Sequence, residues 1–117
     1  LLVGVNSCTD ISGFGLLGHL CNMARESGVS ACVFNNAVPR MEGAETLAIA
    51  EKTMQSGAQR NMDHHHPAVT LSRGVSNESL KLLYDPQPSG GLLLSIQPSK
   101  SVSMESVIAL FERGWIN

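Results

Sequence analysis

Long hydrophobic runs, aromatic rings and an excess of charge are all scarce in this sequence of 117 residues. No apolar run approaches the roughly 18 to 20 residues that a membrane-spanning helix requires, so we expect no membrane association. Aromatic residues make up 4% of the chain, and the formal net charge is -2. Because nucleic-acid binding relies on basic surfaces and on aromatic stacking, this composition argues against a nucleic-acid partner.

Cysteine pairs with C-x-x-C spacing are also missing, since the three cysteines are Cys8, Cys21 and Cys32. An odd number of cysteines without the spacing of a zinc finger favours reduced thiols, and therefore a cytoplasmic protein. Cys8 adjoins a turn where its thiol could be reactive, but no base is identifiable near it. We predict that Cys8 is a buried structural cysteine.

The chain ends carry few signals of their own. The first five residues contain no basic segment, so we expect no signal peptide. Hydrophobic residues reach 43%, which suffices for a core, and the length suits one domain. Because an initiator Met is missing and a new apolar run stops at residue 117, we expect a single domain over residues 1–117 that is truncated at both ends.

Hydrophobic periodicity and turn signals predict an alternation of strands and helices. Residues 57–77 have no clear pattern and are expected to form an irregular loop, while residues 78–84 stay unassigned. The prediction places strands at 1–7, 29–34 and 92–96, the last buried on both faces, and helices at 13–27, 44–55 and 99–113. This order predicts an α+β protein, an α/β sandwich with a mixed β-sheet covered by helices.

The clearest candidate for chemistry is T-D-I-S-G-F-G at residues 9–15, where a turn enters the first predicted helix. Backbone N–H groups at a helix start lack partners, and a glycine such as Gly13 lets an anion approach them closely. The carboxylate of Asp10 would repel a phosphate directly, but it could hold Mg²⁺ that bridges to one. The residues alone leave a second interpretation open, in which Asp10 or Ser12 only caps the helix.

A second candidate is the loop D-P-Q-P-S-G-G at residues 85–91. Its serine and glycines expose backbone donors, and Asp85 could order the turn. The alternative interpretation is a plain tight turn before a buried strand.

Three weaker candidates lie elsewhere in the chain. His19 falls between apolar helical positions, so a packed, hydrogen-bonded histidine is favoured over a metal ligand. Arg60 and Asn61 together are a weak signal for binding an anion or an acidic partner. The run Asp63-His64-His65-His66 is predicted to be solvated, because adjacent histidines cannot all face one metal.

Two motifs resemble a known family. Residues 8–20 read C-T-D-I-S-G-F-G-L-L-G-H-L, which is similar to C-T-D-[VI]-T-G-F-G-L-L-G-H at the start of the C-terminal domain of selenophosphate synthetases, also called selenide, water dikinases. Residues 85–93 read D-P-Q-P-S-G-G-L-L and resemble that family's D-P-Q-T-S-G-G-L-L. The motifs occur in the family's order, and the resemblance covers nearly the whole chain. It implies the fold of the C-terminal domain of aminoimidazole ribonucleotide synthetase.

The resemblance implies an enzyme that converts ATP, selenide and water to selenophosphate, AMP and orthophosphate, as a Mg²⁺-dependent homodimer. Asp10 would then be one of several acidic residues that hold Mg²⁺, and Thr9, Ser12 and Gly13 would bind the ATP phosphates. No catalytic residue is expected in this chain. The family's catalytic Cys or selenocysteine, its Lys and its other metal-binding aspartates lie in an N-terminal domain that has no counterpart here.

The sequence also departs from the family pattern. The usual G-G-T-x-R-N reads S-G-A-Q-R-N at residues 56–61, and Ser12 and Pro88 each replace a threonine. Two other functions therefore remain open: a non-catalytic regulatory or binding paralogue with the same fold, and another ATP-using member of the superfamily. A glycine-rich segment with Cys or Sec followed by Lys, found before Leu1, would favour the dikinase.

Overall fold

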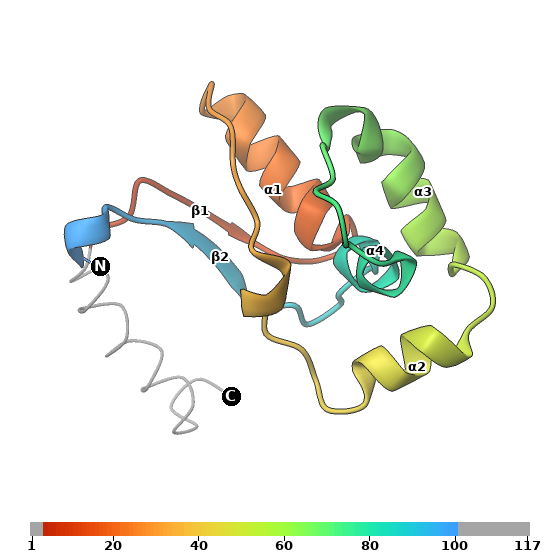
Figure 1. Cartoon of the computed structure of the whole chain (residues 1–117). Helices are drawn as coiled ribbons and strands as arrows, with labels where there is room; N and C mark the ends of the chain where they lie inside the picture. The colour runs from red at the N-terminus through yellow and green to blue at the C-terminus, as the bar shows by residue number, and fades with distance from the viewer. Residues whose placement is uncertain (1–3, 101–117) are drawn as a thin grey trace.

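The computed structural model describes residues 4–100, which form four α-helices and a two-stranded sheet (Figure 1). Helices α1, α3 and α4 pack against one another, α2 packs on α4, and the two-stranded ribbon extends to one side (Figure 1). The elements, with 3-10 helices written η, are β1 (Ser7–Asp10), α1 (Gly15–Glu26), η1 (Asn35–Ala37), α2 (Ala44–Ala50), α3 (Ser56–His65), η2 (His66–Ala68), α4 (Asn77–Tyr84), β2 (Leu92–Ser95) and η3 (Pro98–Lys100). The α+β class is confirmed. Across this described range, no helix is both long and apolar enough to cross a membrane.

The ribbon pairs β1 with β2 in antiparallel register, so that Ser7 faces Ser95 and Asp10 faces Leu92. The sheet within residues 4–100 is therefore antiparallel rather than mixed. The strand predicted at 92–96 is confirmed as β2, but its burial on both faces is wrong, because Leu92 is 54% exposed. The first strand starts later than predicted and runs through Asp10, so it includes the beginning of the expected turn.

The strand predicted at residues 29–34 is wrong. The segment is irregular, and two of its β-prone side chains are exposed, Val29 by 62% and Phe34 by 75%, while Val33 packs against the core. A strand needs a partner for its backbone groups, and no strand among the described residues pairs with this segment. Local propensity therefore does not decide the structure here.

Helix predictions succeed where an apolar stripe is strong. Helix α1 confirms the helix expected at 13–27, and Gly28 ends it in a left-handed conformation with φ +65°. The second helix starts at Ala44 as predicted but ends at Ala50 rather than at residue 55. Lys81 of α4 donates to the carbonyl oxygens of Ala48 and Glu51, which supplies partners for backbone groups at the end of α2.

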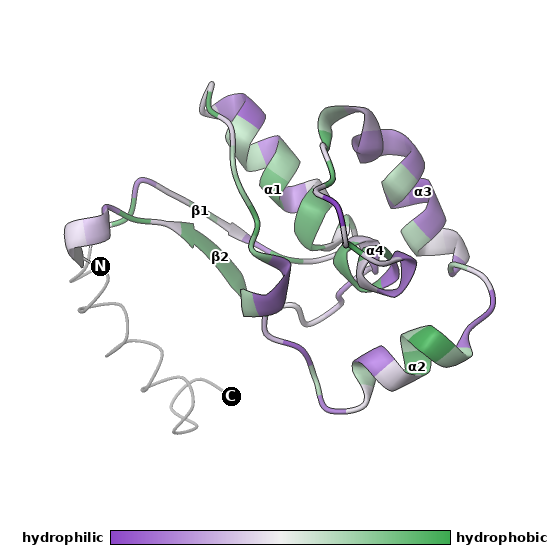
Figure 2. Cartoon of the chain, viewed as in Figure 1, coloured by the Kyte–Doolittle hydropathy of each residue, from purple (hydrophilic) through white to green (hydrophobic). Residues whose placement is uncertain are grey.

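The irregular loop expected at 57–77 is wrong for its first half, which forms α3 and η2. Ala58, Asn61 and His65 are buried on one face of α3, at the i, i+3, i+7 spacing of a helix. Because two of these three residues are polar, hydrophobicity alone does not reveal the stripe. Figure 2 shows that much of α3 is hydrophilic.

The unassigned residues 78–84 belong to α4, which begins after a standard cap. The hydroxyl oxygen of Ser76 accepts a hydrogen bond from the N–H of Ser79 at 3.1 Å, and Glu78 occupies the first turn. This signal is present in the sequence. The helix predicted at 99–113 lies outside the described residues except for its first positions.

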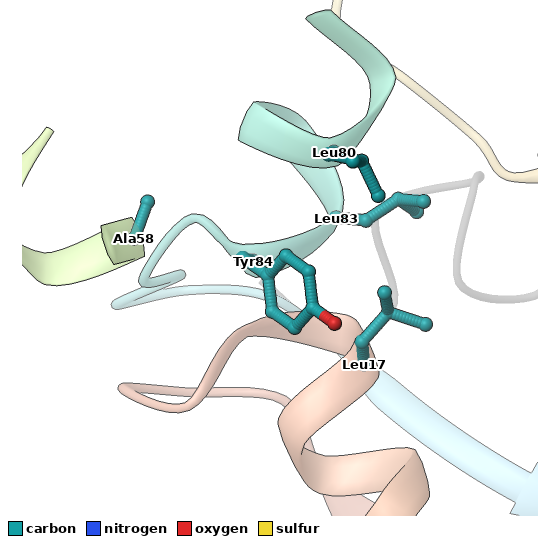
Figure 3. Close-up of a cluster of buried hydrophobic side chains, with 5 residues drawn as sticks. All are labelled: Leu17, Ala58, Leu80, Leu83 and Tyr84. Atoms are coloured by element: carbon teal, nitrogen blue, oxygen red, sulfur yellow. The ribbon is translucent and has the colours of Figure 1, made fainter. Parts of the chain in front are cut away.

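The core joins α1, α3 and α4 at their closest approach (Figure 3). Tyr84, at the end of α4, is 0% exposed and lies among the other buried side chains. Its hydroxyl lies 3.2 Å from Nδ1 of His66. The buried cluster consists of Leu17, Ala58, Leu80, Leu83 and Tyr84.

We predict that alkaline pH weakens the fold through Tyr84, the single tyrosine of the sequence. Burial, assisted by Cys21, raises the pKa of Tyr84 to about 12. The folded pKa lies above the unfolded value near 10, so this stabilisation is complete below pH 10 and disappears as pH approaches 12. The loss should reach about 2 to 3 kcal/mol. Urea unfolding between pH 8 and 12 measures the free energy of unfolding. In Tyr84→Phe, the loss of stability between pH 10 and 12 should be smaller by this amount. A pH dependence in Tyr84→Phe that runs parallel to that of the wild type would contradict the assignment.

Candidate functional site

Two connections meet beside the ribbon and form the candidate site. We call residues 11–14, between β1 and α1, the first loop, and residues 85–91, between α4 and β2, the second loop. The N–H of Gln87 donates to the carbonyl of Ser12 at 3.0 Å, and the N–H of Ile11 donates to the carbonyl of Gly91 at 2.9 Å. The antiparallel register places both loops at the same end of the ribbon (Figure 1). The two motifs singled out in the sequence therefore form one surface.

Glycine permits this close approach at two positions. A Cβ on Gly90 would lie 2.6 Å from the carbonyl oxygen of Ile11, and a Cβ on Gly15 would lie 2.8 Å from backbone atoms of Tyr84 and Asp85. Gly15 also has a φ of +71°, which residues with a side chain rarely adopt. Any other residue at Gly90 would push the two loops apart, and any other residue at Gly15 would push α1 away from the start of the second loop.

Asn61 of α3 joins the first loop to the end of α4, where the second loop begins. Its amide nitrogen donates to the carbonyl of Gly13 at 2.8 Å and to that of Tyr84 at 2.9 Å. The prediction that Arg60 and Asn61 together bind an anion or an acidic partner is wrong for Asn61, whose side-chain amide is committed to these carbonyls. Arg60 lies on the opposite, exposed side of the helix. Helical spacing to Ala58 is the signal that could have revealed the inward position of Asn61.

His19 holds the first loop from α1. Its Nε2 accepts a hydrogen bond from the N–H of Ser12 at 3.0 Å and lies 3.3 Å from the hydroxyl of Ser12. The Phe14 ring packs against His19, with the two ring centroids 5.3 Å apart. The prediction of a packed, hydrogen-bonded His19 is confirmed. Since a backbone N–H can only donate, Nε2 of His19 carries no proton in this arrangement.

The three consecutive histidines have separate surroundings. His65 is buried and lies edge-on to Phe14, with ring centroids 6.0 Å apart, while His64 is exposed and His66 contacts Tyr84. Solvation of the whole run is therefore wrong, because the helix turns His65 inward. Burial lowers the pKa of His65, and the neighbouring His64 lowers it further. The neutral ring of His65 is thus favoured inside the packed helices.

Asp10 lies exposed at the end of β1. It does not cap α1, whose N-cap is Phe14 without a side-chain hydrogen bond, so the capping interpretation is wrong. Gly13 is exposed too, and a Cβ built on it would meet nothing within 4 Å. Within residues 4–100, the N–H groups of Gly13 and Phe14 donate no hydrogen bond to the protein. A carboxylate and free backbone donors are therefore exposed within a few residues of one another, between the end of β1 and the start of α1.

Thr9 and Ser12 are less available than Asp10. The hydroxyl of Thr9 donates to the carbonyl of Asp10 at 3.2 Å, and both the N–H and the hydroxyl of Ser12 lie against His19. Both side chains are half-buried. Cys8 of β1 is exposed, so its predicted burial is wrong; alternate residues of β1 face opposite sides of the ribbon.

Asp85 orders the second loop, as the turn chemistry predicts. Its Oδ2 accepts a hydrogen bond from Nε2 of Gln87 at 2.9 Å. Burial raises the pKa of Asp85, and the nearby Glu51 raises it further. Pro88, Ser89 and Gly91 remain exposed beside the first loop. Together, the end of β1 and the exposed parts of the two loops can present one carboxylate and backbone donors to a ligand.

Comparison with known proteins places the chain in a family. Residues 1–113 match the model of the AIR synthase related protein, C-terminal domain. The chain is 44% identical over 102 residues to a selenide, water dikinase of Geobacter metallireducens, covering 87% of this chain and 29% of that relative. It is 38% identical over 104 residues to a selenide, water dikinase of Trichlorobacter lovleyi, covering 89% and 30%. It is 46% identical over 92 residues to a "Selenide, water dikinase 2" of Peptoclostridium acidaminophilum, covering 79% and 26%.

The chain thus spans between a quarter and a third of the length of these relatives. The family match extends through both loops and every helix and strand described above. The chain belongs to the family of AIR synthase-related C-terminal domains.

Proposed function

We propose that this chain is the C-terminal domain of an ATP-dependent selenophosphate synthetase. The full protein would convert selenide, ATP and water to selenophosphate, AMP and orthophosphate. The relatives named selenide, water dikinase support this proposal. The observation that carries it is the junction of the two loops, where Asp10 and Gly13 are exposed beside the second loop.

In this proposal, Asp10 holds Mg²⁺ on the ATP phosphates. A hard cation such as Mg²⁺ binds carboxylate oxygens, and the exposed carboxylate of Asp10 suits that chemistry. Bound Mg²⁺ would offset negative charge on the phosphate oxygens during phosphoryl transfer. One carboxylate is too few for a tight Mg²⁺ site, so the other ligands would come from residues outside this chain and from ATP itself.

The backbone of the first loop would bind phosphate oxygens. The free N–H groups of Gly13 and Phe14 lie at the start of α1, where the helix dipole favours negative charge. The open space at Gly13 permits close approach. Ser12 and Thr9 would contribute from beside this surface, although their hydroxyls would first have to exchange their present contacts, and Thr9 faces the other side of β1 from Asp10. His19 keeps the loop in place and excludes the N–H of Ser12 from this role.

The remaining parts of the proposal concern the whole protein. We infer a cytoplasmic homodimer whose catalytic Cys or selenocysteine and Lys belong to another domain. The alternative of a non-catalytic paralogue would keep the loop arrangement and lack turnover. Measuring selenide-dependent AMP formation by the full-length protein distinguishes the two, because only the synthetase forms AMP from ATP in the presence of selenide.

For residues 1–117 alone, we predict no selenide-dependent AMP formation. The resemblance provides no nucleophile within this chain and a single metal ligand, Asp10. The measurement is AMP release from ATP and selenide by the purified chain, with the full-length protein as the positive control. Turnover by the isolated chain close to that of the full protein would contradict the proposal that the nucleophile and the other metal ligands lie in another domain.

A further inference from the structure

The side chain of Asn61 on α3 bonds to the first loop and to Tyr84, the last residue of α4, directly before the second loop. It is 9% exposed, on the same helix face as Ala58 and His65. Its two hydrogen bonds go to backbone carbonyls of Gly13 and Tyr84, which lie 48 and 23 residues away in the chain. Both partners are acceptors, so the amide nitrogen must face them, and both of its hydrogens are used.

The two carbonyls lie where the backbone of each loop is oriented. Gly13 lies in the first loop, next to the free N–H of Phe14, and Tyr84 is the residue that precedes the second loop. The bonds therefore fix the peptide units on which the orientation of the phosphate-facing N–H groups depends. An apolar residue would remove the donor from the buried carbonyl of Tyr84 and from the partly buried carbonyl of Gly13, which is costly. A core residue needed only for packing would not have to carry two donors at this place.

We propose that Asn61 is a positioning residue, which clamps the first loop to the end of α4, where the second loop begins, and thereby sets the geometry of the Mg²⁺ and phosphate surface around Asp10 and Gly13. This inference rests on the proposed function of that surface. The clamp itself, as an arrangement of the protein, is independent of it.

The test uses the full-length protein with Asn61→Ala, and with Ser76→Ala as the control. Ser76 caps the N-terminal end of α4, so its loss destabilises the fold by about 1 kcal/mol without touching either loop. All proteins are compared at temperatures at which each is fully folded. Asn61→Ser, whose hydroxyl can still donate one of the two bonds, provides a milder variant if Asn61→Ala does not fold.

The first measurement is hydrogen exchange by mass spectrometry without nucleotide. The N–H groups of Ile11 and Gln87 connect the two loops, so they report on the clamp. We expect their exchange to accelerate by about tenfold or more in Asn61→Ala and to be unchanged in Ser76→Ala. In Asn61→Ser the acceleration should be smaller. Unchanged exchange at the loops in the Asn61 variants would overturn the proposal, whatever their activity.

The second measurement is the Mg²⁺ dependence of AMP formation. Asn61→Ala should raise the Mg²⁺ concentration at half-saturation by about tenfold, whereas Ser76→Ala should leave it at the wild-type value. Faster loop exchange with an unchanged Mg²⁺ dependence and turnover would overturn the positioning role. If Asp10→Asn also leaves the Mg²⁺ dependence unchanged, the proposed function of the surface is contradicted instead, and the exchange data still decide whether the clamp exists.

Discussion

Asp10→Asn in the full-length protein should lower turnover by about 100-fold or more while leaving the fold intact. The amide keeps the shape of the side chain but loses the negative charge that a hard Mg²⁺ ion requires from its ligand. Asp10 is exposed and none of its side-chain atoms bonds to the described part of the protein. Its replacement should therefore change the free energy of unfolding by about 0.5 kcal/mol or less.

The measurement combines AMP formation across a Mg²⁺ titration with thermal unfolding. Asp63→Asn is a suitable control, because it removes the same charge from an exposed position on α3, where the carboxylate accepts a hydrogen bond from Gln59 and from no other residue of 4–100. We expect the control to match the wild type in turnover. If Asp10→Asn keeps its activity, with Mg²⁺ titrating at the wild-type midpoint, the metal assignment is wrong.

Gly15→Ala should destabilise the protein by about 2 to 5 kcal/mol. Two costs combine at this residue. The φ of +71° disfavours a side chain, and the added Cβ would lie 2.8 Å from backbone atoms of Tyr84 and Asp85. Backbone cannot move aside as the end of a flexible side chain can, so α1 and the second loop must separate.

Gly28→Ala separates the two costs. Gly28 has a similar φ of +65°, but a Cβ there would meet nothing within 4 Å. Its replacement should therefore cost only about 1 to 2 kcal/mol of left-handed strain. Chemical denaturation of both variants provides the comparison. Equal losses would mean that the contact between Gly15 and the second loop contributes nothing.

Sequence reasoning succeeds for features that depend on neighbouring residues. The apolar stripe and final glycine of α1, and the short apolar run of β2, are local patterns, and both elements were predicted. The two loops were identified by their glycines and acidic residues. Their meeting in space follows from the antiparallel pairing of β1 with β2, which connects residues from the two ends of the described chain.

The errors share a physical cause, which is that distant contacts decide the outcome. Residues 29–34 have strand propensity but lack a partner strand among the described residues, and the polar residues of α3 are helical because one face packs inward. The early end of α2 coincides with the contact from Lys81, which lies 33 residues beyond Ala48. The inward role of Asn61 depends on two carbonyls from other parts of the fold. Such partners cannot be read from a local window.

The clamp at Asn61 also has a consequence for synthesis of the chain. The three parts it joins emerge from the ribosome in turn, Gly13 first, Asn61 48 residues later and Tyr84 a further 23 residues after that. Contacts between such distant segments form only after the intervening chain has closed into a loop, which costs entropy. A nascent chain that stops before the second loop therefore has the first motif but not its folded shape. If the proposed function is right, nucleotide would meet a complete binding surface only on a domain whose synthesis has passed residue 91.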